Sequence, residues 1–239
     1  QYWGYGAGLD FERKIIVKEN APEVLARQLE SKNWQVMPIM LAGNTDCYQP
    51  IEAKKKLTRR VLEVLLQYRH PVSIITKNAL ILRDLDLLQE LNKLDLVHVS
   101  ISITTLDEKL RQKLEPRTAS GIKRLEVVRQ LSTAGIPVNV MVAPIIPGLN
   151  DSEIPTIIKQ SAEAGACNVA YTIVRLNGSI GPIFEDWIRQ AFPDRADKVL
   201  NQVADCHGGH LNDSRFGTRM RGEGPFAEDI AQRFRISRQ

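Results

Sequence analysis

Five polar segments of this chain carry the residue types that could bind a small charged ligand. Each follows a short apolar run: GNTDCYQP at 43–50, TKN at 76–78, SISITT at 100–105, APIIPGLND at 143–151 and VRLNG at 174–178. Together they supply hydroxyl, amide, carboxylate and ammonium groups, which can pair with both charges of a zwitterion. The set therefore suits a small polar zwitterion better than a lipid. Ordinary surface loops are the alternative that composition leaves open.

The elements that must position these segments alternate along the chain. Runs rich in β-branched residues predict strands near 36–42, 72–76, 97–103, 138–145 and 169–175. Apolar residues at helical spacing predict helices over 57–69, 81–94, 121–135 and 151–165. An earlier strand in KIIVKE and helix in APEVLARQLES would bring the total to about six units. This alternation predicts an α/β fold with a parallel sheet, which binds ligands at the carboxyl ends of its strands.

The strand VHVSISITT favours a barrel over an open sheet. Its valines and isoleucines alternate with His98, Ser100, Ser102 and Thr104, whereas a strand covered by helices on both faces reads as a continuous apolar run. A barrel with a polar inner face around a ligand accounts for this pattern. An edge strand of an open sheet is the alternative.

The composition is that of a folded, soluble protein. The chain has 239 residues, 43% of them hydrophobic and 25% charged. The net charge of +4 is weak evidence for a polyanionic partner. The basic runs at 54–60 and 109–124 are typical of solvated helix faces, with nucleic-acid contact as the alternative.

The sequence gives no sign of a membrane or of a disulfide framework. No apolar stretch approaches the roughly 18 residues that a membrane-spanning helix needs, and the amino terminus lacks the pattern of a secretion signal. We therefore expect a cytoplasmic protein without a membrane partner. Cys47, Cys167 and Cys206 are far apart and form no CxxC motif, so each is expected to be a reduced thiol.

Eight motifs, in order along nearly the whole chain, resemble the radical S-adenosylmethionine (SAM) enzymes, in particular the branch similar to spore photoproduct lyase. They are GLDFERKIIVKENAPEVL, GNTDCYQPIE, HPVSIITKN, RDLDLL, VSISITTLD, LEPRTAS, APIIPGLND and DSRFGTRMRG. The resemblance implies a partial (β/α)6 TIM barrel, a [4Fe-4S] cluster bound through a CxxxCxxC loop, and SAM as the second cofactor. It also implies reductive cleavage of SAM to a 5′-deoxyadenosyl radical that abstracts hydrogen from a substrate.

One departure from the family is large, because residues 1–239 contain no CxxxCxxC motif. The opening QYWGYGAGLDF resembles the sequence just downstream of that loop, so we expect the first strand and the cluster loop to be missing from this sequence. No metal ligand is therefore assigned, the catalytic residues are unknown, and this chain alone is expected to be inactive. If the natural protein began here, radical chemistry would not be expected.

The resemblance implies a SAM-binding set drawn from the strand ends. The methionine amino group would be received by Asn44, Thr45 and Asp46. Its carboxylate would pair with Lys77, and Ser100 and Ser102 would bind the carboxylate or the ribose. Adenine would pack against Ile146, Pro147, Gly148 and Leu176. The alternatives are a turn cap for Asp46, a solvated side chain for Lys77, and serines that satisfy only backbone groups.

A second set of residues is expected to contact the substrate, which by analogy with the DNA-repair lyase would be nucleic acid. It comprises Tyr48, Gln49, His98, Arg175, Arg215, Arg219 and Arg221. The segment DSRFGTRMRGEGPF has too few aromatic residues for a stacking platform, and a lid paired with nearby acidic residues is its alternative.

The expected organisation is a barrel domain over residues 1–178 and a helical, arginine-rich extension over 179–239. The partners would be SAM, an electron donor such as flavodoxin or ferredoxin, and nucleic acid. The competing functional hypothesis is a cluster-free β/α-barrel module that binds nucleic acid or another anion without radical chemistry.

Overall fold

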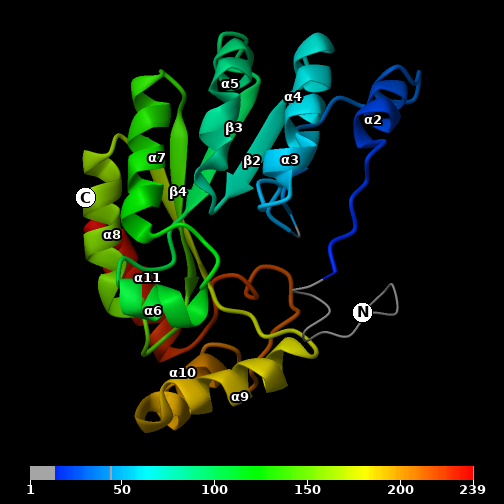
Figure 1. The fold of residues 1–239 in the computed structure, drawn as a ribbon. Helices are drawn as coiled ribbons and strands as arrows, with labels where there is room; N and C mark the ends of the chain where they lie inside the picture. The colour runs from blue at the N-terminus through cyan, green and yellow to red at the C-terminus, as the bar shows by residue number, and fades with distance from the viewer. Residues whose placement is uncertain (1–13, 44, 239) are drawn as a thin grey trace. The chain divides into compact units, whose positions relative to one another are not determined.

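Five strands form one open sheet in this computed structural model, which describes residues 14–43 and 45–238 (Figure 1). The strands, in the order in which they lie side by side, are β1 (Ile39–Leu41), β2 (Val72–Thr76), β3 (Val97–Ser102), β4 (Val138–Ile145) and β5 (Asn168–Ile173). The pairs from β1 to β4 are parallel. The expected α/β architecture is thus confirmed, as an open parallel sheet and not a closed barrel.

Helices fill the connections between the strands. They are α2 (Ala21–Leu29), α3 (Glu52–Lys55), α4 (Leu57–Gln67), η1 (Ala79–Asp84), α5 (Leu85–Asn92), α6 (Glu108–Leu114), α7 (Gly121–Thr133), η2 (Asp151–Glu153), α8 (Ile154–Glu163), α9 (Ile180–Ala191), η3 (Pro193–Arg195), α10 (Ala196–Asp205) and α11 (Pro225–Ser237). The helix expected at 81–94 is divided into η1 and α5, and the one expected at 151–165 into η2 and α8. Within the described residues no helix is both long enough and apolar enough to cross a bilayer.

The strand expected in KIIVKE does not form, so five strands and not six are described. Residues 14–18 have no regular secondary structure. Ile15 and Ile16 are 44% and 56% exposed, and a strand is stable only when its backbone is paired and one of its faces is buried. The prediction was wrong because an apolar run in the sequence does not show whether a partner strand is present.

Two compact units divide the described chain. The sheet unit comprises residues 18–141 and 159–170, and the C-terminal unit comprises residues 14–17, 142–158 and 171–238. The boundary expected at residue 178 falls inside the C-terminal unit. The division into domains at that residue stays a prediction.

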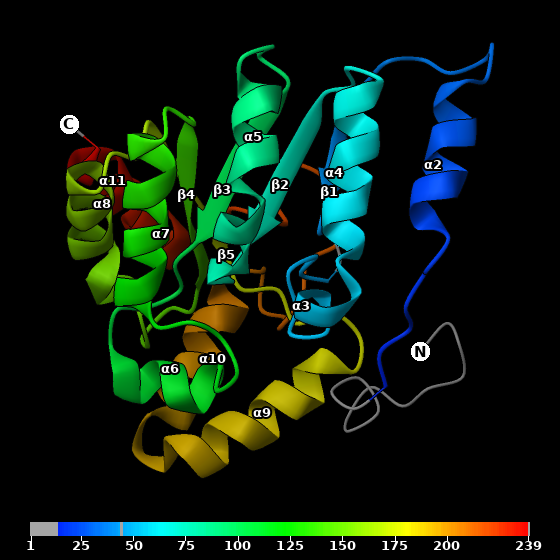
Figure 2. The ribbon, with the colours of Figure 1, turned by 45° about the horizontal axis from the view of Figure 1, so that its top comes forward.

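Alternation along the strands builds the core of the sheet unit. The helices α4, α5 and α7 lie side by side over one face of the sheet (Figures 1 and 2). The strand residues buried on this face are Val72, Ile74, Val99, Ile101, Val138 and Val140. The residues between them, such as Ser73 and His98, are at least partly exposed near the amino ends of the strands. The period of two therefore directs polar groups to the face without these helices, as the sequence pattern predicts.

Candidate functional site

Asp46 ties the loop after β1 to the carboxyl end of β2. Its Oδ1 accepts hydrogen bonds from the Thr76 hydroxyl at 2.7 Å and from the backbone N–H of Tyr48 at 2.9 Å. Its Oδ2 accepts the backbone N–H of Lys77 at 2.8 Å. A carboxylate has about four acceptor positions, and most of those on Asp46 are used by its own chain. Asp46 therefore orders this strand end, and its role toward an ammonium group stays a prediction.

The neighbours of Asp46 in the loop have different environments. Thr45 is exposed and Gln49 is partly exposed, so their expected contacts with ligand stay predictions. Asn44 lies outside the described residues. The Cys47 thiol is partly buried, and burial, followed by the nearby Asp46 charge, raises its pKa to about 12. A thiol in that state is protonated near neutral pH.

Tyr48 lies in the core of the sheet unit. Its side chain is 0% exposed, and burial, with the nearby charge of Asp84, strongly raises the pKa of its phenol. Its expected contact with the substrate stays a prediction. The phenol belongs to the core of the sheet unit, where its ring contributes apolar packing.

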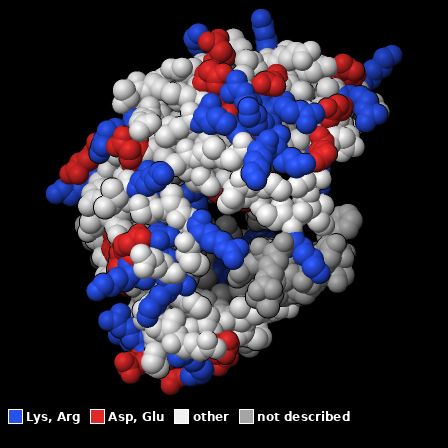
Figure 3. All heavy atoms as spheres, viewed as in Figure 1, with Lys and Arg blue, Asp and Glu red and all other residues white. Residues whose placement is uncertain are grey.

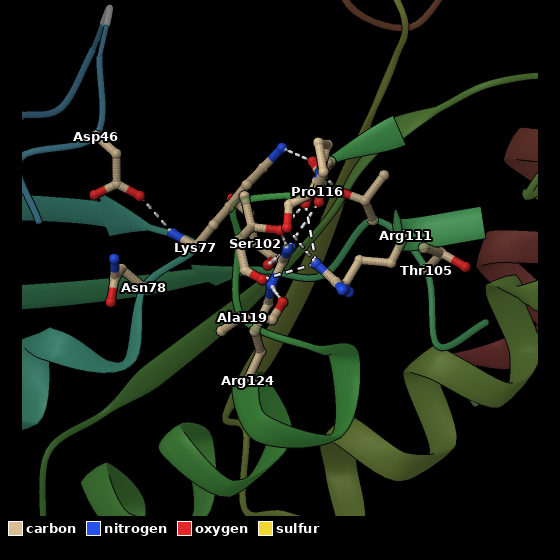
Figure 4. A network of polar contacts seen from close by, with 12 residues as sticks. Asp46, Lys77, Asn78, Ser102, Thr105, Arg111, Pro116, Ala119 and Arg124 are labelled. Atoms are coloured by element: carbon tan, nitrogen blue, oxygen red, sulfur yellow. Dashed lines mark hydrogen bonds and ion pairs between the residues drawn. The ribbon is translucent and has the colours of Figure 1, made fainter. Parts of the chain in front are cut away.

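Lys77, Glu115 and Arg124 form a buried ionic network at the carboxyl ends of β2 and β3 (Figure 4). The Lys77 ammonium pairs with Glu115 Oε1, which also accepts the Thr104 hydroxyl at 2.9 Å. Arg124 Nη2 donates to Glu115 Oε2 at 2.7 Å. The side chains of Lys77, Glu115 and Arg124 are 31%, 9% and 2% exposed. Lys77 is thus the most accessible of the three ions.

Electrostatics keeps the Glu115 carboxylate ionised inside this network. Burial by itself would raise the pKa of Glu115, but the positive charges of Lys77 and Arg124 and their hydrogen bonds outweigh it and lower the pKa. With two cations and one anion, the three side chains carry one net positive charge. The Asp46 carboxylate, which accepts the Lys77 backbone N–H at the same strand end, balances this charge. What could attract an anion there is therefore the Lys77 ammonium itself and not a net surplus.

Two arginines fix the loop that carries Glu115. Arg124 donates from Nη1 to the Ser102 carbonyl and from Nε to the Ala119 carbonyl, both at 2.9 Å. Arg111 Nη1 donates to the Glu115 carbonyl at 3.1 Å and to the Thr118 carbonyl at 2.9 Å. Guanidinium groups offer several donors in a rigid plane, so they cross-link this loop to the end of β3 (Figure 4).

Gly121 lets the start of α7 approach the chain after β3. A Cβ atom added at this position would lie 2.5 Å from the Thr105 carbonyl oxygen. The preceding Ser120 side chain accepts the Lys123 N–H and begins the helix. Arg124 can therefore reach β3 from the first turn of α7.

The two predicted serines lie beside this network. The register pairs Ile75 with Ser100 and Thr76 with Ile101, which brings Lys77 next to Ser102. Ser100 and Ser102 are 9% and 6% exposed. The structure thus brings Lys77 and Ser102 together at one strand end, and the role of both serines toward a ligand stays a prediction.

His98 lies at the other end of the sheet from Lys77 and Ser102, and its expected contact with the substrate stays a prediction. It is the second residue of β3, and its ring contacts Ser73 at 3.4 Å and the Asn139 amide at 2.5 Å. At about 3.3 Å per residue, His98 is roughly 13 Å along the strand from Ser102. Asn139 in turn meets the exposed Cys167 thiol at 3.4 Å. This polar row crosses the amino ends of the strands, whereas ligands in such sheets bind at the carboxyl ends.

The residues expected around adenine lie in the C-terminal unit. The side chains of Ile146 and Leu176 are buried there, at 1% and 3% exposure, and Pro147 is buried as well. Gly148 has a φ of +75°, a backbone conformation that residues with a side chain rarely adopt, so glycine is favoured at this turn. Contact of this segment with adenine stays a prediction.

The arginine-rich segment 213–223 is held by an acidic anchor. Asp213 accepts two hydrogen bonds from the Arg215 side chain, both at 3.0 Å, and one from the Thr218 hydroxyl at 2.8 Å. These contacts, led by the Arg215 side chain, lower the pKa of Asp213. Arg215 also pairs with Glu223. Arg215 is thereby occupied by acidic partners within the segment.

Phe216 is the residue of this segment that the sequence reasoning missed. Its side chain is 92% exposed, and the Arg219 guanidinium lies 5.4 Å from the centre of its ring. Arg221 is also exposed, while Arg175 is partly buried with Nη1 3.4 Å from Met220 Sδ. The signal was an isolated aromatic residue among arginines and glycines. Substrate contact by these arginines stays a prediction.

The basic run on α3 and α4 is largely neutralised by its neighbours. Lysine and arginine side chains gather over these helices (Figure 3). Lys55 pairs with Glu19, Arg60 with Glu23, and Arg59 with Asp86 at 2.7 Å. This pairing is typical of a solvated helix surface, the interpretation that the sequence favoured.

The described residues do not provide a cluster site. No group of three or more His, Cys, Asp or Glu side chains among them could hold a metal ion. Cys47 and Cys167 lie in the sheet unit and Cys206 in the C-terminal unit. A [4Fe-4S] cluster needs several thiolates at one point. The thiols of the described residues therefore do not fit that cofactor.

Comparison with known proteins assigns the chain to a family. A family model described as the radical SAM superfamily matches residues 10–160, more than half of the chain. The chain belongs to the radical SAM superfamily. It is 33% identical over 196 residues to the uncharacterized protein Rv2578c of Mycobacterium tuberculosis, covering 81% of this chain and 58% of that one. It is 30% identical over 191 residues to the uncharacterized protein MJ0683 of Methanocaldococcus jannaschii, covering 80% and 68%.

Solved structures share the fold. A mutant of spore photoproduct lyase matches with a TM-score of 0.60 and 16% identity, over 93% of this chain and 64% of the lyase chain. The lyase complexed with dinucleoside spore photoproduct matches with a TM-score of 0.58 and 16% identity, over 94% and 63%. The chain thus spans less than two thirds of these lyase chains and of the mycobacterial relative. The open sheet corresponds to the partial barrel of the lyase.

Proposed function

We propose that this chain is the SAM-binding part of a radical SAM enzyme that binds the amino-acid end of SAM at the carboxyl ends of β2 and β3. The observation that carries the proposal is Lys77. Its side chain is 31% exposed, and its ammonium is paired with a buried carboxylate. An ammonium so placed can hold a carboxylate. Thr45 and Asp46, in the adjoining loop, are proposed to receive the ammonium of the same ligand.

The chemistry would come from the cofactors, and the chain would bind and orient them. When bound, a [4Fe-4S] cluster supplies one electron for reductive cleavage of SAM, which yields the 5′-deoxyadenosyl radical that abstracts hydrogen from a substrate. We propose that the cluster ligands lie outside residues 1–239. The electron donor would be a flavodoxin or a ferredoxin. Lys77 would fix the methionine end of SAM so that its sulfonium group keeps one orientation.

Nucleic acid is the proposed substrate class. Phe216 offers an exposed aromatic face, and Arg219 and Arg221 lie close to it in the sequence with side chains suited to phosphate. Nucleic-acid bases of any type can stack on an aromatic side chain, and arginine side chains pair with phosphate groups. A structurally similar protein, spore photoproduct lyase, has been solved with a dinucleoside spore photoproduct. A lyase-type reaction is part of this proposal.

The test uses the full-length protein. After anaerobic reconstitution with iron and sulfide, it should gain iron–sulfur absorbance and release 5′-deoxyadenosine from SAM when a strong reductant is added. Lys77→Met should weaken SAM binding at least tenfold while the cluster absorbance is kept. If the full-length protein showed neither the absorbance nor 5′-deoxyadenosine, the proposal would be wrong.

A cluster-free module that binds nucleic acid or another anion is the second candidate. It is favoured by one observation, that the described thiols do not gather at a common point. This candidate predicts binding of single-stranded nucleic acid that falls steeply with salt. It also predicts that no longer form of the protein cleaves SAM. Cleavage of SAM by the full-length protein would exclude it.

A further inference from the structure

Glu115 is the fixed member of its pair with Lys77. Its side chain is 9% exposed and is held by Thr104 and Arg124 as well as by Lys77. Lys77 is 31% exposed, and among the described residues Glu115 is the acceptor that its ammonium contacts. The anchored carboxylate therefore determines where the flexible lysine lies.

The anchor does not depend on Lys77. Arg124 binds Glu115 while its other nitrogens hold the carbonyls of Ser102 and Ala119. Arg111 holds the Glu115 carbonyl from the other side of the loop. If Lys77 moved toward a ligand, Glu115 would stay in place. The network is thus built to orient the lysine, and not the reverse.

We propose that Glu115 is a positioning residue for the ligand carboxylate and acts through Lys77. A lysine ammonium has three N–H donors. One of them points to Glu115, which leaves two for the carboxylate of SAM. Without Glu115, the four-carbon side chain of Lys77 would have to be ordered by the ligand itself, and that ordering would weaken binding. The inference deepens the proposed function and rests on it.

The competing effect has the opposite sign, which makes the inference testable. Glu115 is an anion close to the proposed carboxylate position, so its removal also removes a repulsion. If repulsion outweighed positioning, Glu115→Gln would bind SAM more tightly. We expect positioning to dominate, because Arg124 and Lys77 already compensate the Glu115 charge.

The experiment is a titration of the full-length, cluster-reconstituted protein without reductant, so that binding is read without turnover. Two probes are compared by calorimetry: SAM, and 5′-methylthioadenosine, which lacks the amino-acid end. Glu115→Gln should weaken SAM binding about fivefold to tenfold and leave 5′-methylthioadenosine unchanged. In a Lys77→Met background the same substitution should have no further effect, because Glu115 acts only through the lysine.

Two other variants complete the test. Glu126→Gln removes an exposed carboxylate on α7 and should bind both probes as the wild type does. If Glu115→Gln does not fold, Glu115→Asp is measured instead. It keeps the charge but withdraws it by one methylene, and it should also weaken SAM binding.

The outcomes separate the two proposals. Unchanged or tighter SAM binding by the Glu115 variant would overturn the positioning role. Equal losses for both probes, or a loss that persists without Lys77, would overturn it too. If the wild-type protein bound no SAM at all, the proposed function itself would fail and this inference with it.

Discussion

Arg124→Met is the substitution that probes the ionic network most directly. The arginine side chain is 2% exposed and donates to two backbone carbonyls, to the Glu115 carboxylate and to the Thr118 hydroxyl. Methionine keeps much of the apolar volume but removes the charge and every donor. Removing one partner of a buried ion pair costs about 3–5 kcal/mol. For a chain of this size that corresponds to a fall in melting temperature of about 6–20 °C.

The assay is thermal unfolding followed by calorimetry at neutral pH. Arg129→Met is the matched control, because Arg129 lies on the same helix with a 60% exposed side chain paired to Glu126. It should melt close to the wild type. The double variant Arg124→Met with Glu115→Gln should regain part of the loss, because no buried charge is then left with one of its two cationic partners missing.

A small effect would contradict the reasoning. If Arg124→Met melted within about 2 °C of the wild type, the network would contribute little to stability. If the double variant were less stable than Arg124→Met by the full cost of Glu115→Gln alone, the two side chains would act independently. Either result would also remove the support for Glu115 as an independently anchored carboxylate.

Three further outcomes are expected. Gly121→Ala should lose about 1–3 kcal/mol of unfolding free energy in chemical denaturation, because its Cβ would lie 2.5 Å from the Thr105 carbonyl oxygen. The control Gly43→Ala, whose Cβ would have nothing within 4 Å, should be nearly neutral. Equal effects of the two substitutions would refute the close approach at Gly121. The pKa of Glu115 is lowered by folding from its ordinary 4.5, so its contribution is fully present above that pH and is lost as the pH falls through the folded-state pKa. Glu115→Gln should therefore flatten the acid side of the stability profile, and an unchanged profile would count against the lowered pKa. Iodoacetamide at pH 8 should label the exposed Cys167 well before Cys47, because the pKa of the Cys47 thiol is raised to about 12. Peptide mass spectrometry measures the two labelling rates, and faster labelling of Cys47 would contradict the prediction.

Local patterns were sufficient for most of the elements. The strands at 72–76 and 138–145 lie where the sequence predicts them, because alternation of apolar residues depends only on near neighbours. The strand predicted in KIIVKE does not form, for the complementary reason. Its apolar residues match a strand, but a strand exists only with a partner, and pairing is decided far away in the sequence.

The candidate site was predictable by position but not by contact. The strand-end rule indicated Lys77 and Asp46, and both lie at a strand end. Tyr48 was expected to contact the substrate, yet its side chain is 0% exposed. His98 was expected to contact the substrate, and it lies on a strand with a polar face. A polar face does not by itself show that a residue is near the carboxyl end of its strand. Burial and distance along the sheet are properties of the folded chain.

The sequence alone determined the strand–helix alternation, the parallel sheet and the polar strand ends, because each of these depends on residue types a few positions apart. Only the tertiary structure decided that Lys77 is paired with Glu115, 38 residues later in the chain. It also decided that Arg124 binds the Glu115 carboxylate of that pair. Those contacts depend on how β2, β3 and the loop before α7 pack together. The charge of a side chain follows from the sequence, whereas the partner that it contacts depends on the fold.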